Sequence, residues 1–318
     1  MNNFLITGFS GFVSKHFIDY LNDHHEGAIV IGLDINDPAF SFIHYENIVC
    51  SFKKVNLIET EAVKNILLEF QPDYILHLAS FSSVAYSWEQ PVNAFVNNLN
   101  IFLNLVDQIR LLSINCRVLS VGSSEEYGKI LQSNLPLVED MPVNPISPYA
   151  VARHSQEQLS KVYCDGYGLN IVMTRSFNHI GPGQLEKFAI PSFIKKILEA
   201  KKNNEKSITV GNVNIVRDFV DVRDVVKAYY LLLLNGKKGE IYNICSNQGV
   251  TLKSIIENIM DLVGYHIEIE IDPALVRPND NEIIIGSYDK IKNQLNWEPT
   301  IKLNQSLKDI IEDWKNNS

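Results

Sequence analysis

Cysteine is scarce in this chain, and the few cysteines are scattered. Cys50, Cys116, Cys164 and Cys245 are the only four among 318 residues, and none forms a Cys-x-x-Cys pair or lies near a histidine cluster with metal-ligand spacing. This spacing excludes a disulfide scaffold and a cysteine-based metal centre. We therefore expect reduced thiols in a cytoplasmic protein that carries no metal.

Positive charge is also limited. The chain has 28 Lys and Arg against 37 Asp and Glu, a formal net charge of -9, and no long basic stretch. Nucleic acid and anionic membrane surfaces are therefore poor partners, although a few placed arginines can still hold an anionic substrate. The longest apolar run of helical pattern, at residues 229–234, is too short to cross a bilayer, and the first residues enter a strand pattern with no signal-peptide features.

Hydrophobic residues are plentiful, at 46% of the chain, which suffices for one large domain or two moderate ones. Runs rich in Val, Ile and Leu lie at 4–7, 29–33, 74–78, 117–121 and 171–174, with helical patterns at 13–22, 59–70, 94–112 and 149–167. Buried strands alternating with helices predict a parallel sheet covered on both faces. With right-handed crossovers this is a doubly wound α/β fold of the Rossmann type.

The pattern changes after Ser176. Glycine-rich loops appear, helices shorten, and residues 267–271 alternate strictly, as a half-exposed strand does. The segment at about 213–246 again has the pattern of a helix followed by a buried strand, so we expect it to return to the first sheet. We expect a first domain at 1–175 joined by about 213–246, and a smaller C-terminal α/β lobe at about 176–212 and 247–318.

A glycine-containing turn follows the first predicted strand. Gly8 and Gly11 permit a tight turn and close backbone approach, and the helix after them presents free N–H groups that suit a pyrophosphate. Phe9, Ser10 and Phe12 belong to the same predicted cofactor loop. The third glycine of the usual dinucleotide fingerprint is replaced by a serine, which is small enough to preserve helix–sheet packing.

The second predicted strand ends at Asp34. An acidic side chain at this point accepts hydrogen bonds from both ribose hydroxyls and repels a 2′-phosphate, so NAD is expected and NADP is the alternative. A loop aspartate that caps a turn is the other interpretation of the same residue.

Tyr149 and Arg153 lie one helical turn apart, in a helix that Ser147 and Pro148 can start. A fixed positive charge beside a phenol favours the ionised form, which can exchange a proton with a sugar hydroxyl near neutral pH. Taken alone, the same spacing also fits an exposed amphipathic pair.

Several sequence motifs that occur in a fixed order favour the catalytic interpretation of Tyr149 and Arg153 over the exposed pair. They are Leu76-His77-Leu78-Ala79, Gly122-Ser123-Ser124-Glu125-Glu126-Tyr127-Gly128, Ser147-Pro148-Tyr149, Phe177-Asn178-His179-Ile180-Gly181-Pro182-Gly183-Gln184, Arg217-Asp218-Phe219-Val220-Asp221-Val222-Arg223-Asp224, and Arg277-Pro278. On these runs the chain resembles, over essentially its whole length, the extended short-chain dehydrogenase/reductase family. Within it the chain is most similar to the nucleotide-sugar branch and to the GDP-4-keto-6-deoxy-D-mannose reductases.

The resemblance implies roles for individual residues. Tyr149 matches the family's acid/base, Ser123 its catalytic hydroxyl, Arg153 its active-site lysine, and Glu125 the base of related 4,6-dehydratases. The implied cofactor-binding residues add Leu57, Leu78, Ala79 and Ser80 to the glycine loop, Asp34, Tyr149 and Arg153. The implied substrate-binding residues are Ser82, Ser124, Asn178, Arg217 and Arg277, and the C-terminal lobe is expected to bind the nucleotide sugar.

Arg153 is the main departure from the family pattern, because it stands where Tyr-x-x-x-Lys has its lysine. Arginine is always charged and rich in donors, but it cannot relay a proton. Three functions remain open at this point: an oxidoreductase at C4 of a GDP-linked 6-deoxyhexose, a 4,6-dehydratase or epimerase that returns its hydride, and a binding protein impaired by Arg153. The resemblance also implies a homodimer formed through the helices at 94–112 and 149–167.

Overall fold

A seven-stranded parallel sheet forms the centre of the computed structural model, which describes residues 2–276 and 281–317. Its strands are β1 (Asn3–Thr7), β2 (Ala28–Asp34), β3 (Ile48–Lys54), β4 (Tyr74–His77), β5 (Arg117–Ser123), β6 (Asn170–Ser176) and β10 (Ile241–Ile244). They lie in the order β3-β2-β1-β4-β5-β6-β10. The order reverses between β1 and β4, and ligands of such sheets bind outside the carboxyl ends at this switch point.

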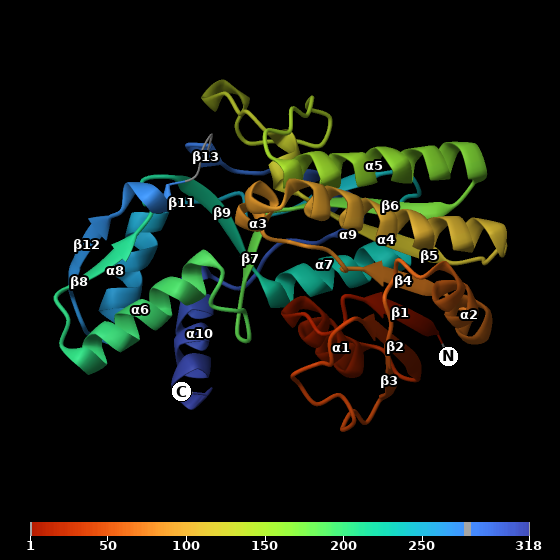
Figure 1. Ribbon diagram of the computed structural model, residues 1–318, viewed down its shortest axis with the longest axis horizontal. Coiled ribbons are helices and arrows are strands. Elements are labelled where there is room, and N and C mark those ends of the chain that lie inside the picture. Colours follow the sequence, from red (N-terminus) through yellow and green to blue (C-terminus); the bar gives the residue numbers. More distant parts are fainter. Residues whose placement is uncertain (1, 277–280, 318) are drawn as a thin grey trace.

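Helices cover both faces of this sheet (Figure 1). One face is covered by α1 (Phe12–His24) and α7 (Val222–Asn235), and the other by α2 (Thr60–Phe70), α4 (Pro91–Leu111) and α5 (Pro148–Tyr167). In β1, Phe4 and Ile6 pack into the first core and Leu5 into the second, as the two-residue period of a strand requires. The predicted doubly wound α/β fold is confirmed.

The five predicted strands and four predicted helices of the first half are present within a few residues of their expected ends. β3 is an additional strand that was not predicted. It is an edge strand, and its burial alternates between buried, intermediate and exposed positions, so it lacks the continuous apolar run of the central strands.

The second lobe has its own core and two small sheets. β7 (Asn178–Ile180), β9 (Val216–Asp221), β11 (Gly249–Thr251) and β13 (Ile283–Ile284) form one sheet, and β8 (Ser207–Val210) pairs with β12 (Glu268–Ile271) in the other. The helices α6 (Ala189–Asn203), α8 (Leu252–Val263) and α10 (Leu303–Asn317) pack around the core of this lobe. Shorter elements are α3 (Val84–Glu89), α9 (Asp289–Leu295), η1 (Ser124–Tyr127), η2 (Gln132–Asn134) and η3 (Pro273–Leu275).

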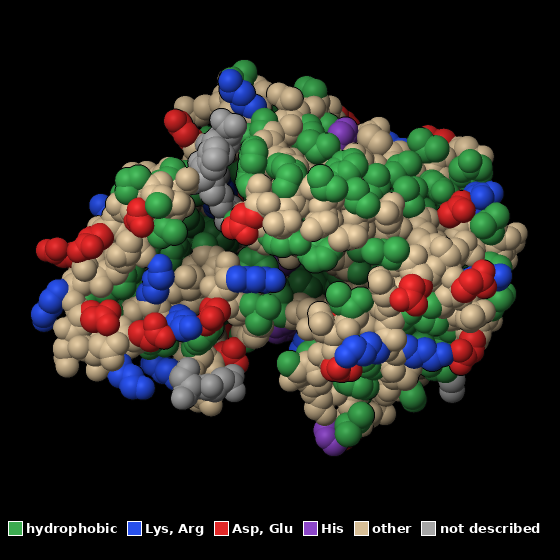
Figure 2. All heavy atoms as spheres, in the orientation of Figure 1, with side chains coloured by type: hydrophobic (Ala, Val, Ile, Leu, Met, Phe, Trp, Pro, Cys, Tyr) green, Lys and Arg blue, Asp and Glu red, His purple; other side chains and the backbone are tan. Residues whose placement is uncertain are grey.

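The chain crosses between the lobes more than once. Within the segment at about 213–246, α7 packs on one face of the large sheet and β10 is one of its strands. β9, in contrast, pairs only with strands of the second lobe. Asp224 of α7 accepts hydrogen bonds from the backbone of Thr300 and Ile301 at 2.8 Å, and so anchors the segment that leads into α10. The exact division into domains stays a prediction. Figure 2 shows the surface hollowed between the two lobes.

Among the residues described in the structure, no helix is both long enough and apolar enough to cross a bilayer.

Candidate active site

The glycine turn lies where the sheet order reverses. Gly8 has φ +72°, and a Cβ added to it would lie 2.8 Å from the backbone nitrogen of Ala79, in the loop that follows β4. Its N–H donates to the carbonyl of Leu33 at 2.9 Å. Both its backbone conformation and its close contact with the neighbouring loop therefore require glycine.

The start of α1 is left open for an anion. Gly11 is the N-cap residue, offers no side-chain cap, and is followed by a first turn without acidic side chains. Uncapped N–H groups and the positive end of the helix dipole face the carboxyl edge of the sheet. Ser14, in the place of the third glycine, is fully buried, and its hydroxyl has no hydrogen-bond partner in the structure.

The carboxylate of Asp34 faces the glycine turn. Its Oδ2 accepts the backbone N–H of Ser10 at 3.0 Å, and its Oδ1 accepts the N–H of Asn36 at 3.0 Å. The residue thus caps the turn, as one interpretation of the sequence proposed. Each carboxylate oxygen can accept a further hydrogen bond, so a role toward ribose hydroxyls is compatible with this geometry.

Tyr149 and Arg153 point toward each other from the first turns of α5. Ser147 caps this helix by accepting the N–H of Ala150 at 3.1 Å, and Pro148 occupies its first turn, as predicted. The Nε–H of Arg153 donates to the Tyr149 hydroxyl at 3.2 Å. Both side chains are buried, at 7% and 4% exposed, so the exposed amphipathic pair is excluded.

The rest of the Arg153 guanidinium is held by three neighbours. Its Nη1 donates to the carbonyl of Val121 at 3.0 Å and to Oε1 of Gln156 at 3.1 Å, and its Nη2 donates to the hydroxyl of Ser80. The side chain therefore bridges α5, β5 and the loop after β4. Gln156 was not among the predicted residues, although its position three residues after Arg153 on the helix was the available signal.

Ser123 ends β5 and begins η1. Its hydroxyl accepts the N–H of Glu125 at 3.3 Å, and its own N–H donates to Oε1 of Glu126 at 2.8 Å. Ser123 and Glu126 also form a capping box, in which each side chain accepts the backbone N–H of the other, and this fixes the turn at the carboxyl edge of the sheet. Ser124 is buried in this turn, and Glu125 is half-buried.

The predicted substrate-binding residues of the second lobe lie on β7 and β9. Asn178 is exposed, and its Nδ2 donates to the carbonyl of Asp218 at 3.5 Å. Arg217 is buried and donates to the carbonyls of Val216 and Asn281 at 2.9 and 2.8 Å. Arg277 lies outside the described residues.

Asp218, the residue after Arg217, is buried and accepts several hydrogen bonds. Its carboxylate accepts hydrogen bonds from Ser246, Asn247 and Gly286, which come from the loop after β10 and the segment after β13. Burial raises the pKa of Asp218 to about 6, although the donors oppose this shift.

Two of the predicted cofactor-binding residues have buried side chains, so only their backbone could contact a cofactor. Phe9 is fully buried and packs against Phe40, Phe42 and Phe52, so its side chain fills a core. Leu57 is also buried, and its carbonyl accepts from the side chain of Asn104. The other predicted positions lie nearer the surface: Phe12, Leu78, Ala79 and Ser80 are partly buried, and Ser82 is exposed.

His77 is a core residue. Its Nδ1 lies 2.9 Å from the hydroxyl of Thr7, and burial together with the charge of Arg153 lowers the pKa of His77 to about 3. His179 stacks on Phe12 and hydrogen-bonds the carbonyl of Phe177, and burial lowers the pKa of His179 to about 4. Both imidazoles are therefore neutral at pH 7.

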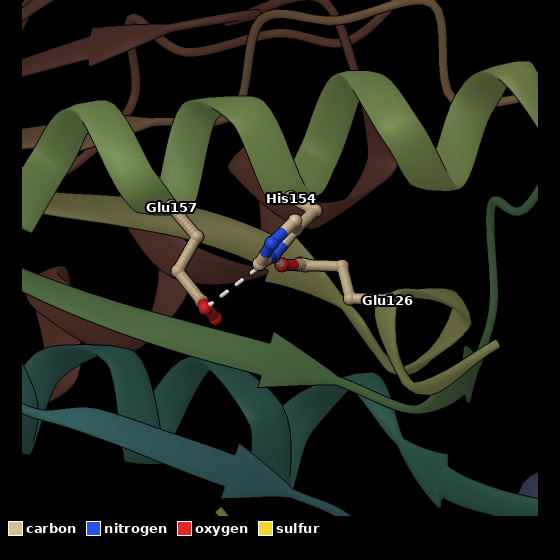
Figure 3. Close-up of side chains that lie close together, drawn as sticks. All are labelled: Glu126, His154 and Glu157. Atoms are coloured by element: carbon tan, nitrogen blue, oxygen red, sulfur yellow. Dashed lines mark ion pairs between the residues drawn. The ribbon is translucent and has the colours of Figure 1, made fainter. Parts of the chain in front are cut away.

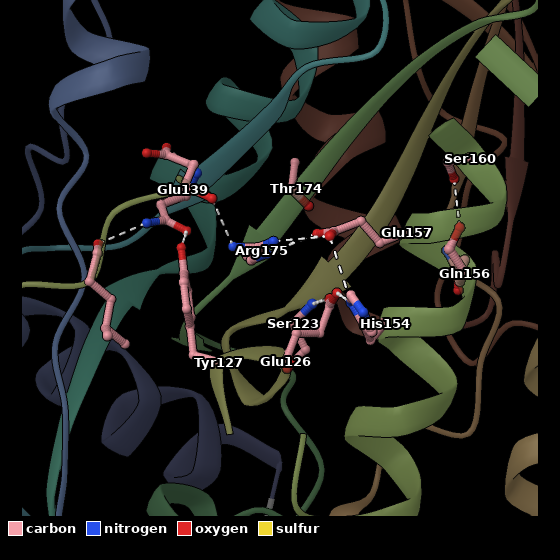
Figure 4. Close-up of polar contacts among 12 residues, drawn as sticks. Ser123, Glu126, Tyr127, Glu139, His154, Gln156, Glu157, Ser160, Thr174 and Arg175 are labelled. Atoms are coloured by element: carbon pink, nitrogen blue, oxygen red, sulfur yellow. Dashed lines mark hydrogen bonds and ion pairs between the residues drawn. The ribbon is translucent and has the colours of Figure 1, made fainter. Parts of the chain in front are cut away.

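A buried polar cluster behind the turn gave no sign in the sequence. The side chain of Glu126 is fully buried and lies near His154 and Glu157 (Figure 3). Glu157 forms a two-point ion pair with Arg175, at 2.8 and 2.9 Å. Figure 4 shows this pair continuing toward Glu139, whose carbonyl accepts from Arg175 at 3.1 Å.

Residues 5–310 match the model of the family described as GDP-mannose 4,6 dehydratase. The chain belongs to this family. The family consists of enzymes, and the related proteins are nucleotide-sugar reductases, dehydratases and epimerases. The predicted membership of the nucleotide-sugar branch is therefore confirmed.

Individual relatives span the whole chain. GDP-6-deoxy-D-mannose reductase of Pseudomonas aeruginosa is 30% identical over 98% of this chain and 96% of its own. dTDP-glucose 4,6-dehydratase of Haemophilus influenzae is 27% identical over 100% of this chain and 99% of its own. The solved structure of RMD from Pseudomonas aeruginosa complexed with NADPH has a TM-score of 0.85, with 29% identity and 100% of both chains covered. UDP-glucose 4-epimerase of Thermotoga maritima with UDP-glucose has a TM-score of 0.86, with 28% identity and 99% of both chains covered.

Proposed function

We propose that this protein is an NAD(P)-dependent oxidoreductase that acts at C4 of a GDP-linked 6-deoxyhexose, and that it reduces GDP-4-keto-6-deoxy-D-mannose. The same residues would serve oxidation at C4. The observation that carries the proposal is the hydrogen bond from Arg153 to the hydroxyl of Tyr149, at 3.2 Å and at the carboxyl edge of the sheet. The similarity to a GDP-6-deoxy-D-mannose reductase supports this choice of sugar.

The glycine turn and the start of α1 fit a dinucleotide. A side chain at Gly8 would collide with the backbone of Ala79, and Gly11 leaves the helix start uncapped, so the pyrophosphate can approach backbone N–H groups. Asp34 would accept hydrogen bonds from the ribose hydroxyls, and Ala79 and Ser80 border the same edge. A bound NAD(P)H would supply the hydride to C4.

The protein's own residues then handle the proton. The Tyr149 hydroxyl donates its proton to the C4 oxygen while the Ser123 hydroxyl hydrogen-bonds the same oxygen. The phenolate that remains is stabilised by Arg153, whose guanidinium is held in place by Ser80, Val121 and Gln156. Because arginine keeps its proton, Tyr149 must be reprotonated by another route, such as solvent or the ribose hydroxyls.

Recognition of the nucleotide diphosphate is assigned to the second lobe. We propose that Arg217 holds the diphosphate, with Arg277 as a second arginine, because a guanidinium binds phosphate in a two-point geometry. Asn178, Ser82 and Ser124 would contact the sugar or the diphosphate.

The choice between NAD and NADP rests on Asp34. Its carboxylate would repel a 2′-phosphate, which favours NAD. The related structure with NADPH keeps NADP as the alternative.

A dehydratase or epimerase is the second candidate, supported by Glu125 and by the family's own description. Glu125 stands two residues after Ser123 in a turn fixed by the capping box, where a base could reach C5. The hydride would then be returned within one turnover.

Incubation of the protein with GDP-4-keto-6-deoxy-D-mannose and NADH or NADPH tests the proposal. We expect one equivalent of cofactor to be oxidised per sugar reduced, followed by absorbance at 340 nm and by mass spectrometry of the product. Loss of water from GDP-mannose without net cofactor oxidation would establish the dehydratase instead. Absence of both reactions, with the folded protein binding cofactor, would refute the C4 assignment.

We also propose a homodimer formed by α4 and α5, which lie side by side on one face of the sheet. Val96, Leu111, Val151 and Val162 are between 41% and 56% exposed on these helices. Figure 2 shows hydrophobic side chains gathered over this part of the surface. Light scattering during gel filtration should give twice the 36.1 kDa chain mass, and replacing Val162 by Asp should shift it to the monomer.

A cytoplasmic location belongs to the same proposal. All four cysteines are unpaired thiols in the structure, as predicted for a reducing compartment.

A further inference from the structure

Two buried side-chain atoms without hydrogen-bond partners face each other behind the proposed active site. They are Oε2 of Glu126 and Nδ1 of His154, and they lie 4.0 Å apart (Figure 3). Glu126 comes from η1, the turn that follows Ser123, and His154 comes from α5, next to Arg153. Buried polar atoms are almost always hydrogen-bonded, so this arrangement calls for an explanation.

The other carboxylate oxygen of Glu126 is already in use. Oε1 accepts the N–H of Ser123 at 2.8 Å and closes the capping box. A Cβ on Gly122 would lie 2.4 Å from the carbonyl oxygen of Thr174 and 2.5 Å from this carboxylate oxygen, so both the neighbouring strand and the carboxylate require glycine there. The position of Ser123 therefore depends directly on where Glu126 lies.

The two cations that act on Glu126, Arg175 and Arg153, oppose the rise of its pKa but direct their hydrogen bonds to other groups. Glu157 faces both partners, and its carboxylate is bound at two points by Arg175, as Figure 4 shows. Arg153 directs its hydrogen bonds to the other side of α5, toward the Tyr149 hydroxyl. The remaining cation that acts on His154 is Lys161, which together with Arg175 opposes an additional positive charge on the imidazole.

Neither partner ionises easily by itself. Burial, and then the charge of Glu157, raise the pKa of Glu126 well above its usual value. Burial lowers the pKa of His154, while Glu157 opposes that shift. One proton placed between the carboxylate oxygen and the ring nitrogen resolves both problems, because either atom can then donate to the other after a small rotation of the imidazole.

We propose that Glu126 and His154 share one proton at neutral pH and that this pair is a positioning element for Ser123. The paired proton holds η1 against α5, and so keeps the Ser123 hydroxyl on the same side of the crevice as Tyr149. The role of Ser123 rests on the proposed function, whereas the shared proton itself does not.

A cation is a weaker occupant of the same place. His154 Nδ1 lies 3.8 Å from Oε1 of Glu157, so three ligand atoms do come near one another. Both oxygens of Glu157, however, already accept from Arg175. The proton can be exchanged from outside, because the His154 side chain is 26% exposed.

Loss of the shared proton at alkaline pH has a defined consequence. Glu126 then becomes a buried anion beside a neutral imidazole, and Glu157 repels it. The turn that carries Ser123 shifts, and we expect kcat to fall with the titration of the pair, while KM for the sugar changes little.

The first test observes the pair without turnover. We would record ¹H–¹⁵N correlations of the histidine rings across pH in the wild-type protein, assign His154 with His154→Gln, and repeat the titration in Glu126→Gln. We expect the wild-type His154 ring to titrate in a coupled way that Glu126→Gln changes by about one pH unit or more. An unchanged His154 titration in Glu126→Gln overturns the proposal, and so does a ring signal that shifts on addition of EDTA or Zn²⁺, because a cation then fills the place.

The second test measures the effect on catalysis as a pH profile. Glu126→Gln retains an oxygen for the Ser123 N–H and a donor for His154, so we expect kcat at pH 7 within about fivefold of wild type and loss of the pair's alkaline limb. Glu126→Leu leaves the Ser123 N–H without its acceptor, and kcat should fall about tenfold or more at every pH. His44→Gln, at an exposed histidine, is the matched control and should leave the profile unchanged.

An alkaline limb that persists unaltered in Glu126→Gln overturns the positioning role. If no sugar is turned over by any variant, the proposed function fails, yet the ring titration still decides whether the proton is shared.

Discussion

Replacement of Arg153 is the most direct test of how the site works. The structure gives this side chain four acceptors: the Tyr149 hydroxyl, the Val121 carbonyl, Gln156 Oε1 and the Ser80 hydroxyl. A lysine keeps the charge but concentrates its donors at one atom, so it cannot span the same set. Arg153→Met has a similar reach but removes both the charge and all of these donors.

The expected changes in stability and in kcat follow from these hydrogen bonds. In Arg153→Lys we expect about two of the four hydrogen bonds to be lost. Gln156 Nε2 still donates to the Val121 carbonyl at 3.4 Å, and water can reach Ser80, so the free energy of unfolding should fall by only about 1–3 kcal/mol. Because the positive charge beside Tyr149 remains, kcat should stay within about tenfold of wild type, equivalent to about 1.4 kcal/mol in the barrier. Arg153→Met should lower kcat by about 100-fold or more.

Steady-state reduction of the keto sugar at pH 7, with urea unfolding of each variant, checks both numbers. If the folded Arg153→Lys protein is as inactive as Arg153→Met, a positive charge near the phenol is insufficient and the guanidinium geometry itself is required. Full activity in Arg153→Met would remove Arg153 from the mechanism.

Three further predictions concern the cofactor turn and the second lobe. Asp34→Ala should weaken NADH binding about tenfold or more, but NADPH binding much less, in fluorescence titrations; an equal loss would exclude a ribose contact. Gly8→Ala should destabilise the fold and reduce cofactor affinity at least tenfold, whereas Gly183→Ala, also at positive φ but with no atom within 4 Å, should carry only the conformational cost of about 1–2 kcal/mol; equal effects would contradict the steric argument. The raised pKa of Asp218, about 6 against 3.8, means that the folded state binds this proton more tightly, so its contribution to stability is present below about pH 4 and is lost as pH rises through 6. Relative to Asp218→Asn, wild-type stability in urea should therefore fall by roughly 3 kcal/mol over that interval, and parallel pH curves would contradict the assignment.

The order of apolar runs and helical patterns in the first half of the chain was enough to predict the doubly wound sheet. Such runs are long where a strand is buried on both faces, as in β1 and β5, and the signal weakens where a strand lies at an edge, as in β3. The helix start at Ser147 and Pro148 could be predicted because capping chemistry is local. The turn at Gly8 was likewise predictable, although the contact with Ala79 that makes glycine necessary joins residues that are distant in sequence.

Sequence alone determined the family, the fold class and the one-turn spacing of Tyr149 and Arg153, because these depend on local patterns and on motif order. Only the tertiary structure decided that Ser80 and Gln156 hold the guanidinium, and that Glu126 faces His154 across the turn. Ser80 and Arg153 come from separate segments, as do Glu126 and His154, and these segments meet only when the strands assemble in one sheet. Whether a buried carboxylate has a donor is a property of that assembly, so no pattern along the chain encodes it by itself.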